Sequence, residues 1–270
     1  MSSYIFDNAA EQPTTQRFAI LEAIYDPRTI RFLTETAVGP GWRCLEVGGG
    51  SGSIAAWLAD RVGDTGHVLV TDIDPRFLAT LAEAGRPNVE VRRHDVGADP
   101  LPEGEFDLIH ARLVLIHVPT AQAALARMAA GLRPGGWLVV EDFDATFTDR
   151  AFPSDDPANA ATARAAFGAL QHLLITRGAG RNWGRGLYQR FVELGLTEVG
   201  MEAHFVVRPG GSAGAYLDRA NLVQIREAAV GAGLIEGAEM DRMIALLDDP
   251  ACALASPTMF TAWGRCPSSS

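Results

Sequence analysis

Three glycines at alternate positions are the residues of this chain whose spacing most directly suggests chemistry. Gly48, Gly50 and Gly52 follow a short apolar run at residues 44–47 and precede a segment with helical spacing of apolar residues. Glycine lacks a Cβ atom, so such a turn between a strand and a helix lets a ligand approach the backbone amides closely. The alternative interpretation is a tight strand–helix turn that binds nothing.

This loop differs from the dinucleotide-binding fingerprint G-x-G-x-x-G. Ser53 stands where that fingerprint has its third glycine. Glu46 precedes the loop by two residues, and a carboxylate there would repel a pyrophosphate but tolerate a ligand with ammonium and sulfonium charges. The stretch resembles motif I, E/D-x-G-x-G-x-G, of the class I S-adenosylmethionine (SAM) dependent methyltransferases, with Glu46, Gly48, Gly50 and Gly52 at its defined positions.

Two aspartates stand after later predicted strands, where a SAM site needs hydrogen-bond acceptors. Asp72 can accept both ribose hydroxyls, and Ile73 beside it would lie against the adenine ring. The alternative is that Asp72 or Asp74 caps a helix. Asp95 can accept the adenine amine while the amide of Val96 reaches a ring nitrogen; alternatively, Asp95 caps its own turn.

Two further segments extend the resemblance beyond the glycine loop. Residues 106–119 resemble motif IV and the turn after it, and residues 132–136 (Leu-Arg-Pro-Gly-Gly) resemble the segment that leads into the fifth strand. The motifs occur in family order over roughly residues 40–142. The resemblance implies SAM as cofactor and a doubly wound, Rossmann-like α/β fold. Its seven strands would have the order 3-2-1-4-5-7-6, with the seventh antiparallel.

Methyl transfer from a sulfonium needs an aligned nucleophile and, for a hydroxyl acceptor, removal of a proton. We expect His117, after the fourth predicted strand, to be the base, because histidine titrates near neutral pH. Alternatively, His117 packs under the sheet. Arg112 is expected at the same edge of the sheet as one of the residues that bind the cofactor, and Arg17 is the candidate for the SAM carboxylate. The alternative for Arg17 is a surface ion pair with Glu11 or Glu22.

The remaining polar residues of this region receive other predictions. His110 is expected to be structural, inside the fourth strand. Glu141, Asp142 and Asp144 follow the fifth strand, as in metal-dependent catechol methyltransferases, but no Asp-Asn pair is evident downstream. We therefore expect no metal. These acids would face the substrate or solvate a loop.

Alternating strand and helix patterns must position these residues. Short apolar runs predict strands at residues 43–47, 67–71, 89–91, 106–110, 137–140, 202–207 and 259–264, with helical spacing between most of them. Five strand–helix alternations are typical of a parallel, doubly wound sheet. Ligands of such sheets bind outside the carboxyl ends of the strands.

The chain is expected to have three parts. Residues 1–38 form a helical N-terminal arm, residues 39–143 a SAM-binding core, and residues 144–270 complete the sheet. The third part carries helical lid insertions at about 144–190 and 208–257. Candidates for an apolar substrate pocket are Phe167, Trp183, Tyr188 and Met259, although core packing is the simpler alternative for each.

Composition limits the partners. The net charge is −10 and no Lys/Arg cluster occurs, which argues against nucleic acid and favours a small-molecule substrate. The three cysteines have no metal-ligand spacing, and their odd number argues against a disulfide framework. Neither a signal peptide nor an apolar stretch of membrane-spanning length is evident, so we expect a cytoplasmic protein without a membrane partner. A homodimer is left open.

The sequence favours a SAM-dependent methyltransferase acting on a small-molecule acceptor, through oxygen rather than nitrogen or carbon, in secondary metabolism. The alternative is a SAM-binding protein of the same fold that catalyses a cyclisation or rearrangement or serves as a regulatory binder. An NAD-dependent oxidoreductase is disfavoured by Ser53 and Glu46.

Overall fold

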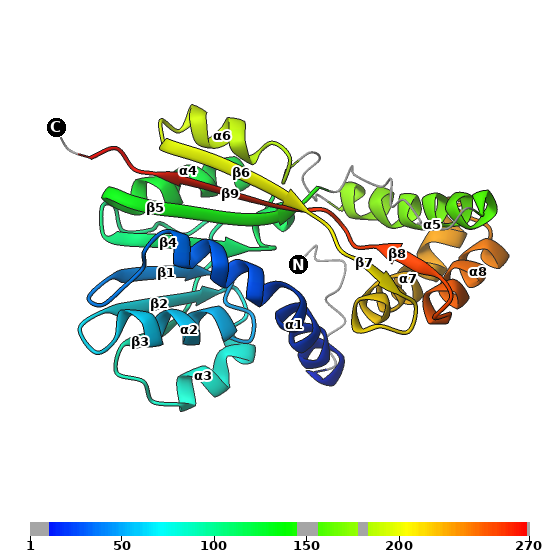
Figure 1. The fold of residues 1–270 in the computed structure, drawn as a ribbon, viewed down its shortest axis with the longest axis horizontal. Helices are drawn as coiled ribbons and strands as arrows, with labels where there is room; N and C mark the ends of the chain where they lie inside the picture. Colours follow the sequence, from blue (N-terminus) through cyan, green and yellow to red (C-terminus); the bar gives the residue numbers. More distant parts are fainter. Residues whose placement is uncertain (1–10, 145–155, 178–182, 269–270) are drawn as a thin grey trace.

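The computed structural model describes residues 11–144, 156–177 and 183–268. Residues 1–10 of the predicted arm and parts of the first predicted insertion (145–155 and 178–182) lie outside the described residues. A twisted sheet with helices on both faces occupies one end of the molecule, and a group of helices, here called the cap, occupies the other (Figure 1). The division of the chain at residues 38 and 143 stays a prediction.

The sheet has seven strands in the order β3-β2-β1-β4-β5-β9-β6. All neighbours are parallel except β9, which is antiparallel to both β5 and β6. This confirms the predicted strand order, in which β9 is the strand numbered seven. In sheet order the strands are β3 (Val89–Arg93), β2 (His67–Asp72), β1 (Arg43–Val47), β4 (Phe106–Arg112), β5 (Leu132–Phe143), β9 (Met259–Arg265) and β6 (Thr197–His204).

Each face of the sheet has its own apolar core. One face is covered by α2 (Ser53–Val62), by η1 (Pro75–Leu78) with α3 (Ala79–Glu83), and by the second half of α1 (Glu11–Glu35). The other face is covered by η2 (Leu115–His117), α4 (Ala121–Gly131) and α6 (Leu187–Glu193). Strands buried on both faces explain why most of them are continuous apolar runs in the sequence.

The position predicted for the sixth strand was wrong. β6 begins five residues earlier than predicted, and residues 207–209 form a separate strand, β7 (Val207–Pro209), paired with β8 (Ala253–Ala255). β6 is an edge strand whose residues are mostly half-buried or exposed, and its register shifts between Thr197 and Gly200. Such a strand lacks both the apolar run and the strict alternation that a sequence pattern needs.

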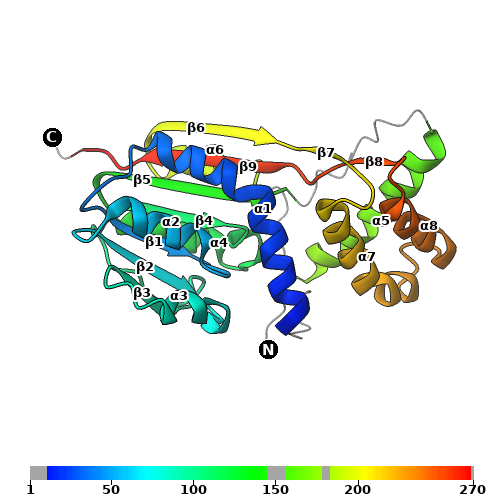
Figure 2. The same ribbon diagram turned by 60° about the horizontal axis from the view of Figure 1, so that its bottom comes forward.

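The cap consists of α5 (Pro157–Thr176), α7 (Ala213–Gly231) and α8 (Gly237–Asp248), joined to the sheet by the β6–β7 and β8–β9 connections (Figure 2). These helices share a core of their own, which includes Phe167, whereas Trp183 belongs to a core of the sheet. Both side chains therefore follow the simpler alternative, core packing, each in a different core.

Helix α1 connects the two ends of the molecule. It continues through Pro27 and runs from the cap along the face of the sheet (Figure 2). Residues Phe18, Glu22, Asp26 and Thr29 fall at i, i+4, i+8 and i+11, so they share one side of this helix. That side faces the carboxyl ends of the central strands.

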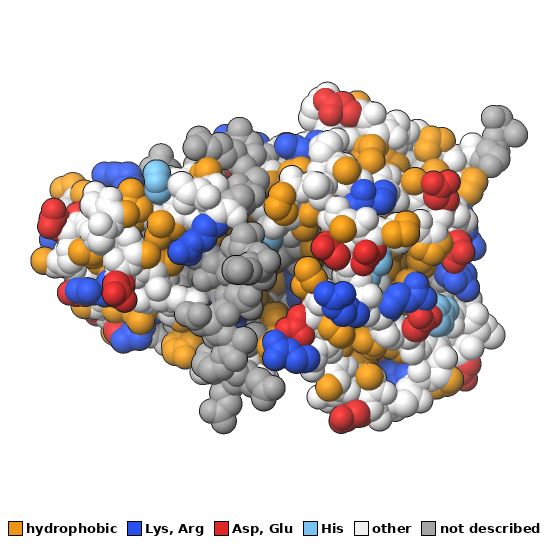
Figure 3. Space-filling model, turned by 180° about the vertical axis from the view of Figure 1, so that it is seen from behind, with side chains coloured by type: hydrophobic (Ala, Val, Ile, Leu, Met, Phe, Trp, Pro, Cys, Tyr) orange, Lys and Arg blue, Asp and Glu red, His pale blue; other side chains and the backbone are white. Residues whose placement is uncertain are grey.

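Acidic and basic side chains are interspersed on the face shown in Figure 3, where neither sign dominates. None of the helices within the described residues is long and apolar enough to cross a membrane.

Candidate functional site

The glycine loop leaves the carboxyl end of β1 and turns into α2. Gly48, Gly50 and Gly52 have φ angles of 70°, 57° and 93°, which non-glycine residues rarely adopt. A Cβ atom on Gly48 would lie 2.2 Å from Cγ2 of Val114. The amide of Gly48 donates to the carbonyl of Thr71 at 2.7 Å, which fixes the loop against the end of β2. Glycine is therefore required here by conformation and by space.

Asp72, the last residue of β2, faces this loop. Its Oδ2 accepts a hydrogen bond from the amide of Gly50 at 3.1 Å, and its Oδ1 accepts from the amide of Asp74 at 2.9 Å. Burial raises the pKa of Asp72, and these amide hydrogen bonds oppose the rise. Asp74, rather than Asp72, caps η1 by accepting from the amide of Arg76. Ile73 lies between them with 57 % of its surface exposed, unusual for a large apolar side chain.

Asp95 and Val96 follow β3 at the same edge. Oδ1 of Asp95 accepts from the amide of Gly97 at 2.8 Å, which is the turn-capping contact that the sequence left as the alternative. Val96 is buried, and its carbonyl accepts from Arg127 at 2.6 Å. The Val96 side chain is thus held in the core while its backbone lies at the edge of the sheet.

The first half of α1 lies directly over the glycine loop. A Cβ atom on Gly50 would be 3.5 Å from the ring of Phe18, and Ser51 donates a hydrogen bond to Glu22. Burial and the neighbouring Asp26 carboxylate raise the pKa of Glu22. The helix therefore brings an aromatic ring and a carboxylate to the loop.

Arg112, the last residue of β4, fastens α1 to the sheet. Its guanidinium donates to Asp26 at 2.8 Å and to Thr29 at 2.9 Å, and its side chain is 12 % exposed. These two partners belong to successive turns of α1. Arg112 therefore lies at the expected edge of the sheet, where it holds α1 in place.

Below Arg112 a buried row of ionisable groups crosses three strands. His110 in β4 donates from Nδ1 to Glu46 in β1 at 2.7 Å and from Nε2 to Glu141 in β5 at 3.3 Å. Burial alone would lower the pKa of His110, but the two carboxylates raise it to about 9. Thr261 of β9 donates to Glu141 at 2.8 Å. His110 is therefore a buried cation at neutral pH, and Glu46 behind the loop is bound to it.

His117 ends η2, near enough to α1 for the charge of Arg17 to act on it. Burial, together with the positive charge of Arg17 nearby, lowers the pKa of His117 to about 4. Arg17 donates to Oδ1 of Asn221 in α7 at 2.6 Å. The structure thus brings together His117, which the sequence predicted as a base, and Arg17, which it predicted as a carboxylate ligand. The neutral form of His117 is strongly favoured, so it is a weak base.

Two of the three acids predicted after the fifth strand, Glu141 and Asp142, lie within β5, and Asp144 follows it. They do not solvate a loop, because all are buried. Glu141 belongs to the row just described. Oδ2 of Asp142 accepts from the indole of Trp183 at 3.1 Å and from a backbone amide of η2, and Oδ2 of Asp144 accepts from Arg185 at 2.7 Å. Across the described ranges, no three His, Cys, Asp or Glu residues gather as a metal site.

Residues 44–136, which include the glycine loop and the ends of β2, β3 and β4, match the family model of a methyltransferase domain. The chain carries a methyltransferase domain of the class I fold.

Relatives of this methyltransferase domain agree over the same region. The chain is 35 % identical over 119 residues to the ubiquinone/menaquinone biosynthesis C-methyltransferase UbiE of Shewanella halifaxensis, and the match covers 42 % of this chain and 47 % of that protein. The chain therefore spans about half the length of this relative.

Solved structures share the fold over a longer stretch. YcgJ of Bacillus subtilis superposes with a TM-score of 0.57 at 14 % identity, covering 90 % of this chain and 99 % of that one. The [4+2]-cyclase SpnF superposes with a TM-score of 0.50 at 17 % identity, covering 97 % and 84 %. At these identities the likeness concerns the fold alone.

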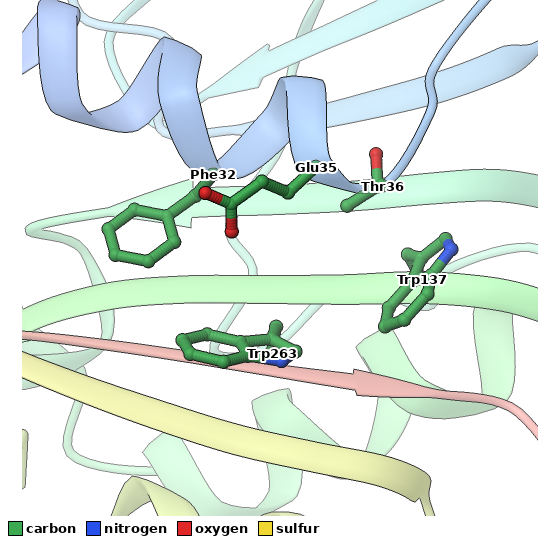
Figure 4. A pocket seen from close by; sticks show the side chains of 5 residues that line it. All are labelled: Phe32, Glu35, Thr36, Trp137 and Trp263. Carbon is green, nitrogen blue, oxygen red and sulfur yellow. The ribbon is translucent and has the colours of Figure 1, made fainter.

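A cavity of about 210 Å³ lies in another part of the sheet (Figure 4). Its walls come from the end of α1, the first half of β5 and β9, away from the glycine loop of the methyltransferase domain. The lining side chains are Phe32, Glu35, Thr36, Trp137 and Trp263. This cavity contains none of the residues predicted for the cofactor or for catalysis.

Sequence reasoning missed the polar residues that α1 and α7 bring to the methyltransferase domain. Glu22, Asp26 and Thr29 could have been grouped by their helical spacing, but nothing in the spacing names their partners on the sheet. Asn221 carries no sequence signal, because its contact with Arg17 spans 204 residues.

Proposed function

We propose that this protein is an enzyme that transfers the methyl group of SAM to a small-molecule acceptor. The observation that carries the proposal is the arrangement of Asp72 against the loop, within a matched methyltransferase domain. Its carboxylate is held by the amide of Gly50, and the exposed Ile73 stands beside it. A carboxylate next to an exposed apolar side chain is suited to a ribose that carries a flat base.

The residues at this edge fit SAM. The carboxylate of Asp72 would accept the ribose hydroxyls, since each of its oxygens uses one lone pair toward an amide and keeps another. Ile73 would cover one face of the adenine ring. Asp95 would accept from the adenine amine through Oδ2, because Oδ1 serves the amide of Gly97, and the Val96 amide would reach a ring nitrogen.

The loop and the row of buried charges would hold the other half of the cofactor. Gly48, Gly50 and Gly52 allow close approach to the backbone, and Glu46 adds negative charge beneath the loop. Arg112 would act by keeping α1 over the site. When bound, SAM supplies an electrophilic methyl group on a positively charged sulfur. We assign Arg17 to the acceptor rather than to the SAM carboxylate, because it lies beside His117 and Asn221.

The acceptor atom is proposed to be oxygen in a secondary metabolite. Arg17 donates to Asn221 of the cap, and its charge acts on His117. Helices α1 and α7 would exclude water from bound reactants. UbiE is a C-methyltransferase by name, so an enolate carbon is the nearest competing acceptor.

Calorimetric titration with SAM and S-adenosylhomocysteine (SAH), followed by an acceptor screen with mass detection, tests the proposal. We expect micromolar binding of both ligands, its loss in Asp72→Ala, and a product heavier by one methylene from phenolic or carboxylic acceptors. The absence of heat with either ligand would refute the cofactor assignment.

The same experiment separates the alternative function. The fold likeness to the [4+2]-cyclase SpnF shows that this architecture does not by itself decide the reaction. Binding of SAM without SAH formation across the acceptor screen would favour a cyclisation catalyst or a regulatory binder over a methyltransferase.

A further inference from the structure

Glu22 is a carboxylate that α1 places at the glycine loop. It is half-buried, and its Oε1 accepts a hydrogen bond from the hydroxyl of Ser51. Ser51 follows Gly50, whose amide donates to Asp72. Phe18, one turn earlier on α1, lies over Gly50. The carboxylate of Glu22 is therefore next to the part of the loop that Asp72 holds.

The contacts of α1 follow the order of the strands along their carboxyl ends. The ring of Phe18 meets that of Phe77, in η1 after β2, with 5.2 Å between the ring centroids. Glu22 contacts the loop after β1, and Asp26 is bonded to Arg112 at the end of β4. With adenosine at the ends of β2 and β3, as proposed above, the amino-acid end of SAM would extend toward β1 and β4. It would then lie between the loop and the side of α1 that carries Glu22.

Two other carboxylates near the loop are bonded to basic side chains. Glu46, beneath the loop, is almost fully buried and is bonded to His110. Asp26 accepts from the guanidinium of Arg112. The carboxylate at the end of β2 is assigned to the ribose. Among the described residues at the loop, Glu22 is therefore the carboxylate that can receive a further cation.

Glu22 itself is bonded to a neutral hydroxyl. In the described part of the chain, no ion pair joins it to an arginine or a histidine. Burial raises its pKa, the charge of Asp26 adds to the rise, and the charge of Arg112 opposes it. Arg17, earlier on the same helix, donates to Asn221 of the cap. A carboxylate that is partly desolvated without a cation is stabilised when a cation binds to it.

We propose that Glu22 binds the ammonium group of the amino-acid end of SAM. This inference rests on the proposed function. The carboxylate has lone pairs beyond the one that Ser51 uses, so it can accept from an ammonium group at the same time. Such a charge-assisted hydrogen bond is stronger than one between neutral groups. Glu22 would hold the amino-acid end against the loop and would join α1 to the bound cofactor.

Three ligands separate the ammonium group from the rest of the cofactor. SAH carries both the ammonium and the carboxylate, decarboxylated SAH keeps only the ammonium, and deaminated SAH keeps only the carboxylate. Each is titrated calorimetrically into the full chain, and weak binding is measured by displacement of SAH.

Two variants are compared with the wild type. Glu22→Gln keeps an oxygen for Ser51 and removes the charge. Glu35→Gln is the matched control, because Glu35 is an exposed residue of the same helix that pairs with Arg31.

Glu22→Gln should weaken the binding of SAH and of decarboxylated SAH by about tenfold or more, as the loss of a hydrogen bond to a charged partner implies. Deaminated SAH should bind this variant at least as tightly as the wild type, because it has no ammonium group to lose a partner. Glu35→Gln should leave all three affinities unchanged. If Glu22 served only to fasten α1 to the loop, Glu22→Gln would weaken all three ligands alike.

Equal weakening of the three ligands, or an unchanged SAH affinity in Glu22→Gln, would overturn the inference and leave the proposed function intact. A wild-type protein that binds none of the three would refute the cofactor assignment, and the inference with it. The thermal midpoint of each variant is measured in parallel. If it shows that Glu22→Gln does not fold, Glu22→Ala takes its place under the same criteria.

Discussion

Arg112 at the end of β4 donates a hydrogen bond to Asp26 of α1 at 2.8 Å, with 12 % and 20 % of the two side chains exposed. This pair holds the helix that covers the glycine loop. Because the pair is partly desolvated, we expect a coupling free energy of about 1–2 kcal/mol in a double-mutant cycle of Arg112→Ala and Asp26→Ala.

The exposed pair Arg31–Glu35 on the same helix is the control for that cycle, with 43 % and 56 % exposure. Its coupling should stay below about 0.5 kcal/mol, as for other exposed i,i+4 pairs. Equal coupling for the two pairs would contradict a special role of Arg112 in holding α1.

Gly48 tests how tightly the loop is packed. Gly48→Ala places a methyl group 2.2 Å from Val114 at a φ of 70°. We therefore expect the unfolding free energy to fall by more than about 2 kcal/mol, and SAM binding to be lost. Gly63→Ala has a similar φ of 62° but nothing within 4 Å. It should cost only about 1 kcal/mol. Urea unfolding of both variants makes the comparison.

A second change separates crowding from backbone strain at Gly48. Val114→Ala removes the side chain that the new methyl group would meet, so it should restore part of the stability lost in Gly48→Ala. No recovery would mean that the backbone conformation alone accounts for the loss.

The buried row around His110 predicts a fall of stability at alkaline pH. The pKa of His110 is about 9 in the folded protein, against an ordinary value of 6.5. A raised pKa stabilises the fold fully below pH 6.5, and this contribution is lost as pH rises through 9. We expect the unfolding free energy to drop by about 3 kcal/mol over this window. Urea titrations at pH 6.5 and 9 measure it.

Glu46→Gln is the variant that checks this origin, since it removes one of the two charges that raise the pKa of His110. Its unfolding free energy should fall less steeply between pH 6.5 and 9 than that of the wild type. His117 cannot account for the alkaline loss. Its pKa is lowered to about 4, so its contribution is lost only as pH falls below 6.5. An unchanged slope in Glu46→Gln would contradict the assignment.

Oδ2 of Asp142 accepts a hydrogen bond from the amide of Ile116 in η2. Its other oxygen, Oδ1, is buried without a hydrogen-bond partner. Burial raises its pKa well above the usual range, which favours the neutral form of its carboxyl group. An asparagine side chain would present a similar neutral group at this position; accordingly Asp142→Asn should change the unfolding free energy by less than about 1 kcal/mol. Asp142→Ala should cost about 2–3 kcal/mol by leaving donors unpaired. Thermal unfolding of Asp142→Asn and Asp142→Ala tests both expectations.

Much of the sheet could be predicted because its central strands are buried on both faces. β1 has the predicted bounds, and β2 begins at the predicted residue, His67. β5 is longer than predicted at both ends, since Glu141 and Asp142 continue the strand although they are polar. Their partners in other elements make such burial stable, and a local pattern contains no record of those partners.

The residues of the candidate site also fall into two groups, those that short motifs predict and those that they do not. Residues of the glycine loop and Asp72 could be placed from short motifs, because each lies within a few residues of the strand that positions it. The contacts of α1 could not, since Arg112–Asp26 and Arg17–Asn221 join residues 86 and 204 positions apart. Hydrophobic periodicity predicts the helix but does not indicate which side chains meet across the fold.

The place of β9 in the sheet has a consequence for synthesis. β9 lies between β5 and β6 and is antiparallel to both. The ribosome therefore makes the cap helices before β9 exists to pair with β5 and β6. Between completion of β5 at Phe143 and the start of β9 at Met259, an interval on the order of ten seconds passes at ordinary elongation rates. During that interval an apolar strand edge stays open to other chains. Slower translation of residues 144–258 should therefore increase misassembly of the nascent protein.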